Sequence, residues 1–222
     1  MRIYRDATPN LAFILAKELG LTYSSVLEIG AAHPTNCMSK LFIAEGECKV
    51  TLVEANPRLF YCLKNGYDAG DFQSCWPNVP PGPHQFKGFG DNPNVTLISA
   101  AIGPTKGKDK FYELNASSFL RGEHAPEKFM QGYVENDKDA YEVDVLTIKD
   151  IDNGSHDILL CDVEGAEWHC INGLISTPKL ISLETHGAKG FVNKNISLIL
   201  DWMMERNYKL IAEDPTDSIF IL

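Results

Sequence analysis

Short apolar runs alternate with segments of helical spacing through the first part of the chain. Runs at 26–29 and 50–54 are followed by helix-like segments at 35–44 and 57–64. This alternation is typical of a parallel sheet covered by helices on both faces. A further strand is predicted at 95–99, and apolar runs at 158–161 and 180–183 predict buried strands. The sequence therefore predicts an α/β fold with three layers.

The end of the chain predicts a helix followed by two paired strands. The helix is expected over 195–206, and the strands over 208–212 and 218–222. A turn at Asp214-Pro215 joins the strands and is short enough for antiparallel pairing. The residues of the helix that are expected to face inward are Ile196, Ile199, Leu200 and Met203.

Three other regions shape the predicted domain. Thr8-Pro9 resembles an N-cap with proline in the first helical position, which predicts a helix over 8–20. The segment 66–93 has no sustained period and is read as an inserted loop, either a substrate lid or an insertion without a role. Extra strands are expected at 107–112 and 141–146. A chain of 222 residues suits one core, so we expect a single domain over 1–222.

Composition excludes several classes of function. A net charge of −10 and a pI near 5.0 argue against a nucleic-acid binder, which needs a clustered basic face. The six cysteines lack metal-finger spacing and predict reduced, buried thiols. Neither a signal peptide nor a run long enough to span a membrane is evident, so we expect a cytoplasmic protein.

The hexapeptide 162–167 carries three acids directly after a buried strand. Burying a carboxylate costs several kcal/mol unless it is paired or faces a wet cleft, and in open α/β sheets that cleft lies at the carboxyl ends of the strands. We therefore expect Asp162 and Glu164 to be cleft residues. The alternative is that Glu164 and Glu167 only favour the first turn of a helix. That alternative accounts for Glu167 but not for Asp162.

The first two strands carry features of a nucleoside site. Gly30 begins a turn of small residues after the first strand, but a dinucleotide fingerprint would need three glycines. A ligand without phosphates, such as S-adenosylmethionine, suits this turn better, with Glu28 facing its ammonium end. Glu54 ends the second strand, at a spacing suited to ribose hydroxyls, and Ala100 and Ala101 leave room for a flat base.

The chain resembles the FkbM-type S-adenosylmethionine-dependent methyltransferases. The segments that carry the resemblance are 28–31, 53–57, 99–103, 117–118, 143–148, 162–167 with Gly173, and 183–186. The most specific is the Asp-x-Glu-Gly-x-Glu element at 162–167. The first loop departs from the family, because Ala31-Ala32 stand where a second glycine is usual, and the 66–93 insertion is longer than typical.

This resemblance implies a class I methyltransferase (Rossmann-like) fold, with a seven-stranded, mostly parallel sheet and an antiparallel last strand. It implies O-methylation of a hydroxyl on a sugar, glycan or natural-product small molecule. The candidate cofactor-binding residues are Glu28, Gly30, Ala31, Glu54, Ala55, Asn56, Ala100, Ala101 and Asp162.

Removal of the hydroxyl proton needs a base or a divalent ion. The candidates are Asp162, Glu164 and His186, and a carboxylate-bound metal is a second possibility. His186 has the alternative of a structural histidine bonded to backbone. The rival functions are a nucleotide-dependent oxidoreductase and a non-catalytic binding protein of the same fold.

Overall fold

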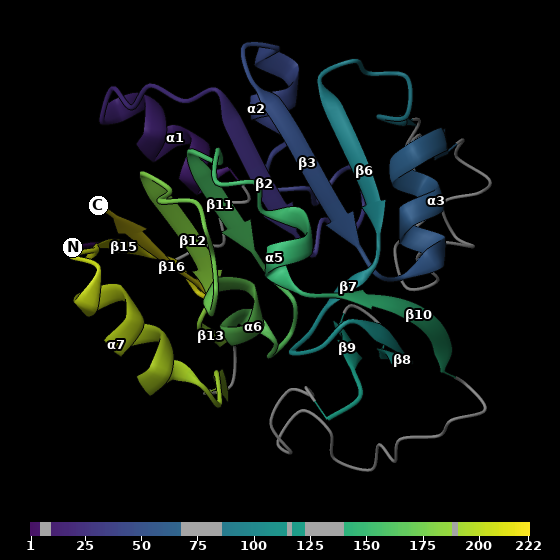
Figure 1. Cartoon of the computed structure of the whole chain (residues 1–222). Coiled ribbons are helices and arrows are strands. Elements are labelled where there is room, and N and C mark those ends of the chain that lie inside the picture. Colours follow the sequence, from purple (N-terminus) through teal and green to yellow (C-terminus); the bar gives the residue numbers. More distant parts are fainter. Residues whose placement is uncertain (5–9, 68–85, 115–116, 123–139, 188–190) are drawn as a thin grey trace.

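A computed structural model describes residues 1–4, 10–67, 86–114, 117–122, 140–187 and 191–222 (Figure 1). Its centre is an eight-stranded sheet in the order β1-β15-β16-β12-β11-β2-β3-β6. In that order the strands are Arg2–Ile3, Lys209–Glu213, Asp217–Ile221, Leu180–Glu184, Ile158–Cys161, Ser25–Ile29, Lys49–Glu54 and Val95–Ser99.

The direction of the strands confirms the predicted sheet. β16 runs antiparallel to both β12 and β15, and the other neighbours in this sheet pair in parallel. The sheet has one strand more than the seven predicted, because Arg2 and Ile3 pair with Ala212 and Glu213 at its edge. A run of two residues carries no periodicity, so this strand left no signal in the sequence.

Helices cover both faces of the sheet, as predicted. Adjacent residues of a strand point to opposite faces, so Val26 and Leu27 of β2 enter two different hydrophobic clusters. The Val26 cluster includes residues of α1 (Leu11–Glu18), α2 (Lys40–Glu45) and α3 (Pro57–Asn65). The Leu27 cluster includes residues of α5 (Ile148–Ile151), α6 (Glu167–Ile171) and α7 (Ile196–Glu205). The three layers are therefore helix, sheet and helix.

Two helices differ in detail from the prediction. α2 begins at Lys40 instead of residue 35, because the backbone before it turns around the carboxylate of Glu28. In α7, Leu200 is 39% exposed, and Trp202 packs inward together with Ile199 and Met203. The N-cap expected at Thr8-Pro9 lies outside the described residues; α1 begins after Asn10.

A second, four-stranded sheet lies beyond the carboxyl ends of the central strands (Figure 1). It has the order β7-β10-β8-β9, with the bounds Ala101–Ile102, Tyr141–Leu146, Gly107–Leu114 and Ser117–Leu120. The extra strands predicted at 107–112 and 141–146 are thereby confirmed. Arg58 of α3 forms an ion pair with Glu113 of β8, and Tyr141 donates a hydrogen bond to the same carboxylate at 3.0 Å. These contacts attach the small sheet to the central layer.

The predicted insertion has an ordered base. β4 (Gly66–Tyr67) pairs antiparallel with β5 (Phe86–Lys87), and Phe89 is buried in the Val26 cluster. Residues 68–85, the body of the expected lid, lie outside the described residues. A further short pair joins β13 (His186–Gly187) to β14 (Phe191–Val192).

Four cysteines, at 37, 48, 161 and 170, are free and buried, as expected. The expectation of reduced thiols is wrong for Cys62, which is disulfide-bonded.

Within the described ranges, no helix has the length and apolar character needed to cross a membrane.

Candidate active site

The register of the central sheet aligns five strand ends. Ile29 of β2 lies opposite Val53 of β3 and Cys161 of β11, and Cys161 lies opposite Leu183 of β12. Each of these residues is followed by a small or acidic residue at the edge of the sheet. The row of edge residues in register is Ser99, Glu54, Gly30, Asp162 and Glu184, and Ala100 follows Ser99. Strands that are far apart in the sequence thus bring the predicted loops side by side.

Gly30 allows the loops after β2 and β11 to approach closely. Its φ is +81°, and a Cβ added there would lie 1.7 Å from the carbonyl oxygen of Asp162. The backbone N–H of Asp162 donates to the carbonyl of Ile29 at 3.0 Å. Only glycine combines this positive φ with such a close contact. Gly30 is therefore required by the packing of these two loops, and its contact with a ligand stays a prediction.

Glu54 lies at the end of β3 and faces the pocket. Its two carboxylate oxygens accept hydrogen bonds from the backbone N–H groups of Ala32 and Asn56, both at 2.7 Å. Its side chain is buried, and burial raises the pKa of Glu54 to about 7. Each carboxylate oxygen can accept a second hydrogen bond, so Glu54 is oriented by the backbone and still able to bind a ligand.

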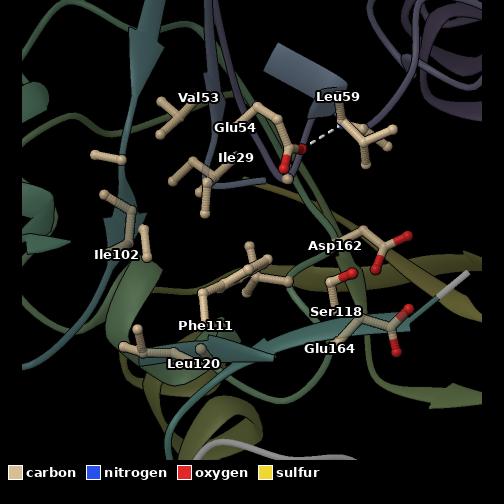
Figure 2. Close-up of a pocket in the computed structure, with 17 residues that line it drawn as sticks. Ile29, Val53, Glu54, Leu59, Ile102, Phe111, Ser118, Leu120, Asp162 and Glu164 are labelled. Carbon is tan, nitrogen blue, oxygen red and sulfur yellow. Dashed lines mark hydrogen bonds between the residues drawn. The ribbon is translucent and has the colours of Figure 1, made fainter. Parts of the chain in front are cut away.

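A pocket lies where these strand ends meet the small sheet (Figure 2). Its empty volume, including the open mouth, is about 640 Å³. Figure 2 shows Asp162, Glu164 and Ser118 on one side and Val53, Ile102 and Leu120 on the other. The charged residues of the described lining are Glu54, Asp162 and Glu164, and this lining includes no lysine, arginine or histidine.

Three carboxylates form a cluster at the end of β11 and β12. Oxygens of Asp162, Glu164 and Glu184 all lie within 4.8 Å of one another. Asp162 and Glu164 line the pocket, and Glu184 lies behind them and is buried. Burial and the neighbouring negative charges raise the pKa of both Asp162 and Glu184 well above the usual carboxyl range. The sequence predicted the first two as cleft residues and did not include Glu184.

Glu167 shapes the acidic loop from within. It is fully buried and accepts the N–H of Val163 at 3.0 Å and the N–H of Gly165 at 3.1 Å, together with a hydrogen bond from the Asn193 amide. Within this loop Glu164 adopts a φ of +57°, which few non-glycine residues do. The last acid of the hexapeptide therefore holds the loop that presents Asp162 and Glu164, which is a more specific role than favouring a helix end.

Three predicted cofactor residues lie outside the described pocket lining. Glu28 is fully buried, and its carboxylate accepts the N–H groups of Met38 at 2.7 Å and Ser39 at 2.9 Å. Glu28 lies opposite Leu52, two residues deeper in the sheet than Glu54, which explains why it faces protein instead of a ligand. Ala31 is buried, and Asn56 caps α3 by accepting the N–H of Arg58 at 3.0 Å. Ala55, Ala100 and Ala101 do line the pocket.

His186 is held by protein groups on both ring nitrogens. Nδ1 lies 2.8 Å from the hydroxyl of Thr185, and Nε2 lies 2.7 Å from the carbonyl oxygen of Asp214. His186 is also absent from the described pocket lining. These contacts match the alternative of a structural histidine bonded to backbone, and the base role of His186 stays a prediction.

The small sheet supplies the residues that sequence reasoning missed. Phe111 of β8, with Ser118 and Leu120 of β9, forms one wall of the pocket. Ser118 belonged to a segment of the family resemblance, but nothing in its local sequence indicated a pocket. Glu184 did carry a signal, because it ends a buried strand in an acid just as Glu54 does.

Comparisons with known proteins identify a family for this chain. The FkbM methyltransferase domain matches residues 28–210. Among solved structures, a precorrin-6y C5,15-methyltransferase from Geobacter metallireducens GS-15 is similar with 11% identity and a TM-score of 0.44, over 99% of this chain and 93% of that one. The methyltransferase domain of bacterial CtHen1-CN is similar with 9% identity and a TM-score of 0.43, over 96% and 97%.

No curated protein matches the chain. The family match extends from the buried part of β2 to β15, and so includes every strand end that contributes to the pocket. The chain belongs to the FkbM methyltransferase family.

Proposed function

We propose that the protein transfers the methyl group of S-adenosylmethionine to a hydroxyl oxygen of a small molecule, such as a sugar, glycan or natural product. The observation that carries this proposal is the charge of the pocket. Its described charged residues, Glu54, Asp162 and Glu164, are all acids. Carboxylates attract a sulfonium and an ammonium group and repel the pyrophosphate of a dinucleotide. This charge favours methyl transfer over the rival oxidoreductase.

The residues fit the cofactor at two points. Glu54 would accept hydrogen bonds from ribose hydroxyls with the lone pairs that Ala32 and Asn56 leave unused. Ala100 and Ala101, both buried in the wall, leave space for a flat base. When bound, S-adenosylmethionine supplies an electrophilic methyl carbon on a positively charged sulfur and leaves as a neutral thioether.

The protein contributes alignment and a destination for the proton. Holding the reactants in line can supply roughly 7–11 kcal/mol of the barrier reduction. Apolar walls at Ile29, Val53 and Phe111 keep water away from the reacting groups. Asp162 and Glu164 are the pocket residues whose oxygens can receive the hydroxyl proton, because His186 is engaged elsewhere.

Calorimetry tests the cofactor directly. The protein is titrated with S-adenosylmethionine, with its demethylated product, and with NAD and NADP in parallel. We expect the first two to bind and the dinucleotides not to bind. Glu54→Gln should weaken binding of S-adenosylmethionine. Glu28→Gln alters a buried acid outside the described pocket lining, and it tests whether the loss of binding follows from changing any buried acid. Tight binding of a dinucleotide would favour the oxidoreductase, and binding of none would favour a non-catalytic protein.

A methyl-transfer assay tests the acceptor. Radiolabelled S-adenosylmethionine is incubated with panels of sugars, phenols, amines and carboxylic acids, and products are identified by mass spectrometry. Label in an ether at a former hydroxyl supports O-methylation. Label found only on nitrogen or carbon would contradict it while leaving the cofactor intact.

A further inference from the structure

We propose that Asp162, Glu164 and Glu184 bind a hard divalent cation at the inner end of the pocket. The cluster arises from the sheet register: β11 and β12 pair so that the residue after Cys161 lies beside the residue after Leu183. One oxygen from each carboxylate lies within 4.8 Å of the others. Oxygens bound to one Ca²⁺ at about 2.3–2.6 Å can be at most about 5 Å apart, so these three can share one ion.

Glu184 provides an independent observation that points to a ligand. It is only 7% exposed, and its Oε2 makes no hydrogen bond within the described part of the chain. A buried carboxylate oxygen without a donor is costly, and most such atoms in native proteins have a partner. The same carboxylate contributes an oxygen to the cluster, and a cation between the carboxylates would compensate it.

The charge of Asp162 and Glu184 is not balanced by an ion pair within the described part of the protein. Asp217, which lies opposite Glu184 on β16, adds another acid to the same region. Buried like charges destabilise a site unless a cation or protons compensate them.

The donor set indicates the class of cation. Three carboxylates without sulfur or imidazole suit Mg²⁺, Ca²⁺ or Mn²⁺ and not a thiolate-preferring metal. Such ions take six or more oxygen ligands, so further positions stay open for water or substrate. Asp162 and Glu164 line the pocket and Glu184 lies behind them, so the open positions face the pocket.

The catalytic role of this cation rests on the proposed function. A hydroxyl oxygen bound to the cation loses its proton more readily. The proton leaves to water, the oxygen electron pair forms the new bond to the methyl carbon, and the electrons of the broken carbon–sulfur bond stay on sulfur. The cation is neither oxidised nor reduced. Acceptors with two neighbouring oxygens, which can chelate one ion, are the class that this site would take.

Metal binding is tested on the protein without any other ligand. Mn²⁺ is titrated and followed by electron paramagnetic resonance, and Mg²⁺ and Ca²⁺ are then added as competitors. We expect one saturable Mn²⁺ site per chain that either ion displaces. Glu184→Gln should raise the Kd for Mn²⁺ at least about tenfold. Asp201→Asn, which removes an exposed acid of α7, should leave the Kd unchanged.

Two further measurements separate ligation from general charge and from misfolding. Asp217→Asn removes a neighbouring acid but no ligand, and should change the Kd by less than about threefold. Without metal, Glu184→Gln should still unfold cooperatively, because Gln has nearly the same shape as Glu, and this shows that the variant is folded. With Ca²⁺, the natural protein should gain stability and the variant should not.

Absence of saturable binding for all three ions, or equal Mn²⁺ affinity in Glu184→Gln, would overturn the inference. The outcomes are distinct from those for the cofactor. Metal binding without S-adenosylmethionine binding would contradict the proposed function and leave the cation site standing. Methyl transfer that needs no cation and is insensitive to chelators, in a protein that binds none, would contradict only the cation site.

Discussion

Gly30 is the residue whose replacement most directly tests how the pocket is built. In Gly30→Ala the new Cβ would lie 1.7 Å from the carbonyl oxygen and 2.7 Å from the carbonyl carbon of Asp162. Both are backbone atoms, so no side-chain rotation relieves the contact. The loops after β2 and β11 would have to move apart by more than about 1 Å, which strains the Asp162–Ile29 hydrogen bond.

The expected loss of stability has two parts. A non-glycine residue at φ +81° lowers the free energy of unfolding by about 1–2 kcal/mol. Alanine also reduces the conformational entropy of the unfolded chain, which offsets about 0.4–1 kcal/mol of that loss. Overpacking against the Asp162 backbone adds about 1–3 kcal/mol. We therefore expect a decrease of about 2–4 kcal/mol in the free energy of unfolding. Binding of S-adenosylmethionine should weaken as well, because Asp162 is displaced from the pocket.

Gly46 offers a matched control. Its φ is +75°, nearly that of Gly30, but a Cβ there would meet nothing within 4 Å. Gly46→Ala should therefore show the conformational cost alone, about 1 kcal/mol, with ligand binding intact. Urea denaturation of both variants and calorimetry with S-adenosylmethionine give the comparison. If Gly30→Ala is no less stable than Gly46→Ala and binds the cofactor normally, the close approach of the two loops is not a real constraint.

Other substitutions probe the remaining acids and the histidine. Burial raises the pKa of Glu54 to about 7, so its contribution to the free energy of unfolding is complete below about pH 4.5 and is lost by about pH 7. Glu54→Gln should therefore remove about 3 kcal/mol from the pH dependence of the free energy of unfolding, measured with urea, between these two pH values. An unchanged pH dependence in the variant would contradict this. His186→Gln should lower the free energy of unfolding by about 1–2 kcal/mol, because ring hydrogen bonds to Thr185 and Asp214 are lost, and kcat should be unchanged. A large loss of kcat with cofactor affinity intact would instead support His186 as the base. Glu167→Gln should cost about 1–3 kcal/mol and speed amide exchange at Val163 and Gly165, and unaltered protection there would refute its role in the loop.

The sequence predicted the layers and the strand ends because both depend on local periodicity. Apolar runs of four or five residues identify buried strands, and the residue that follows each run marks the edge of the sheet. Glu54, Asp162 and Glu164 were found in this way. The same logic also selected Glu28, which is absent from the described pocket lining because an acid one residue before the end of a strand lies deeper in the sheet.

The contents of the pocket depended on contacts that no local pattern encodes. Phe111, Ser118 and Leu120 reach the site only because the small sheet folds back over the carboxyl ends of the central strands. Glu184 joins Asp162 only through the register of β11 and β12, which pairs segments about twenty residues apart. His186 follows the same strand end as Glu184, but its ring is taken up by Thr185 and Asp214.

The row of strand ends divides into two chemical halves. From Ala100 to Gly30 the residues are small or engaged with backbone, which suits a flat, neutral nucleoside held by Glu54. At Asp162 and Glu184 the carboxylates have few described partners, which suits positive charge. Glu184 is absent from the described pocket lining, so a cofactor in the pocket does not account for its buried oxygen. The proposed cation, held by Glu184 together with Asp162 and Glu164, would account for that oxygen and would place the acceptor beside the cofactor.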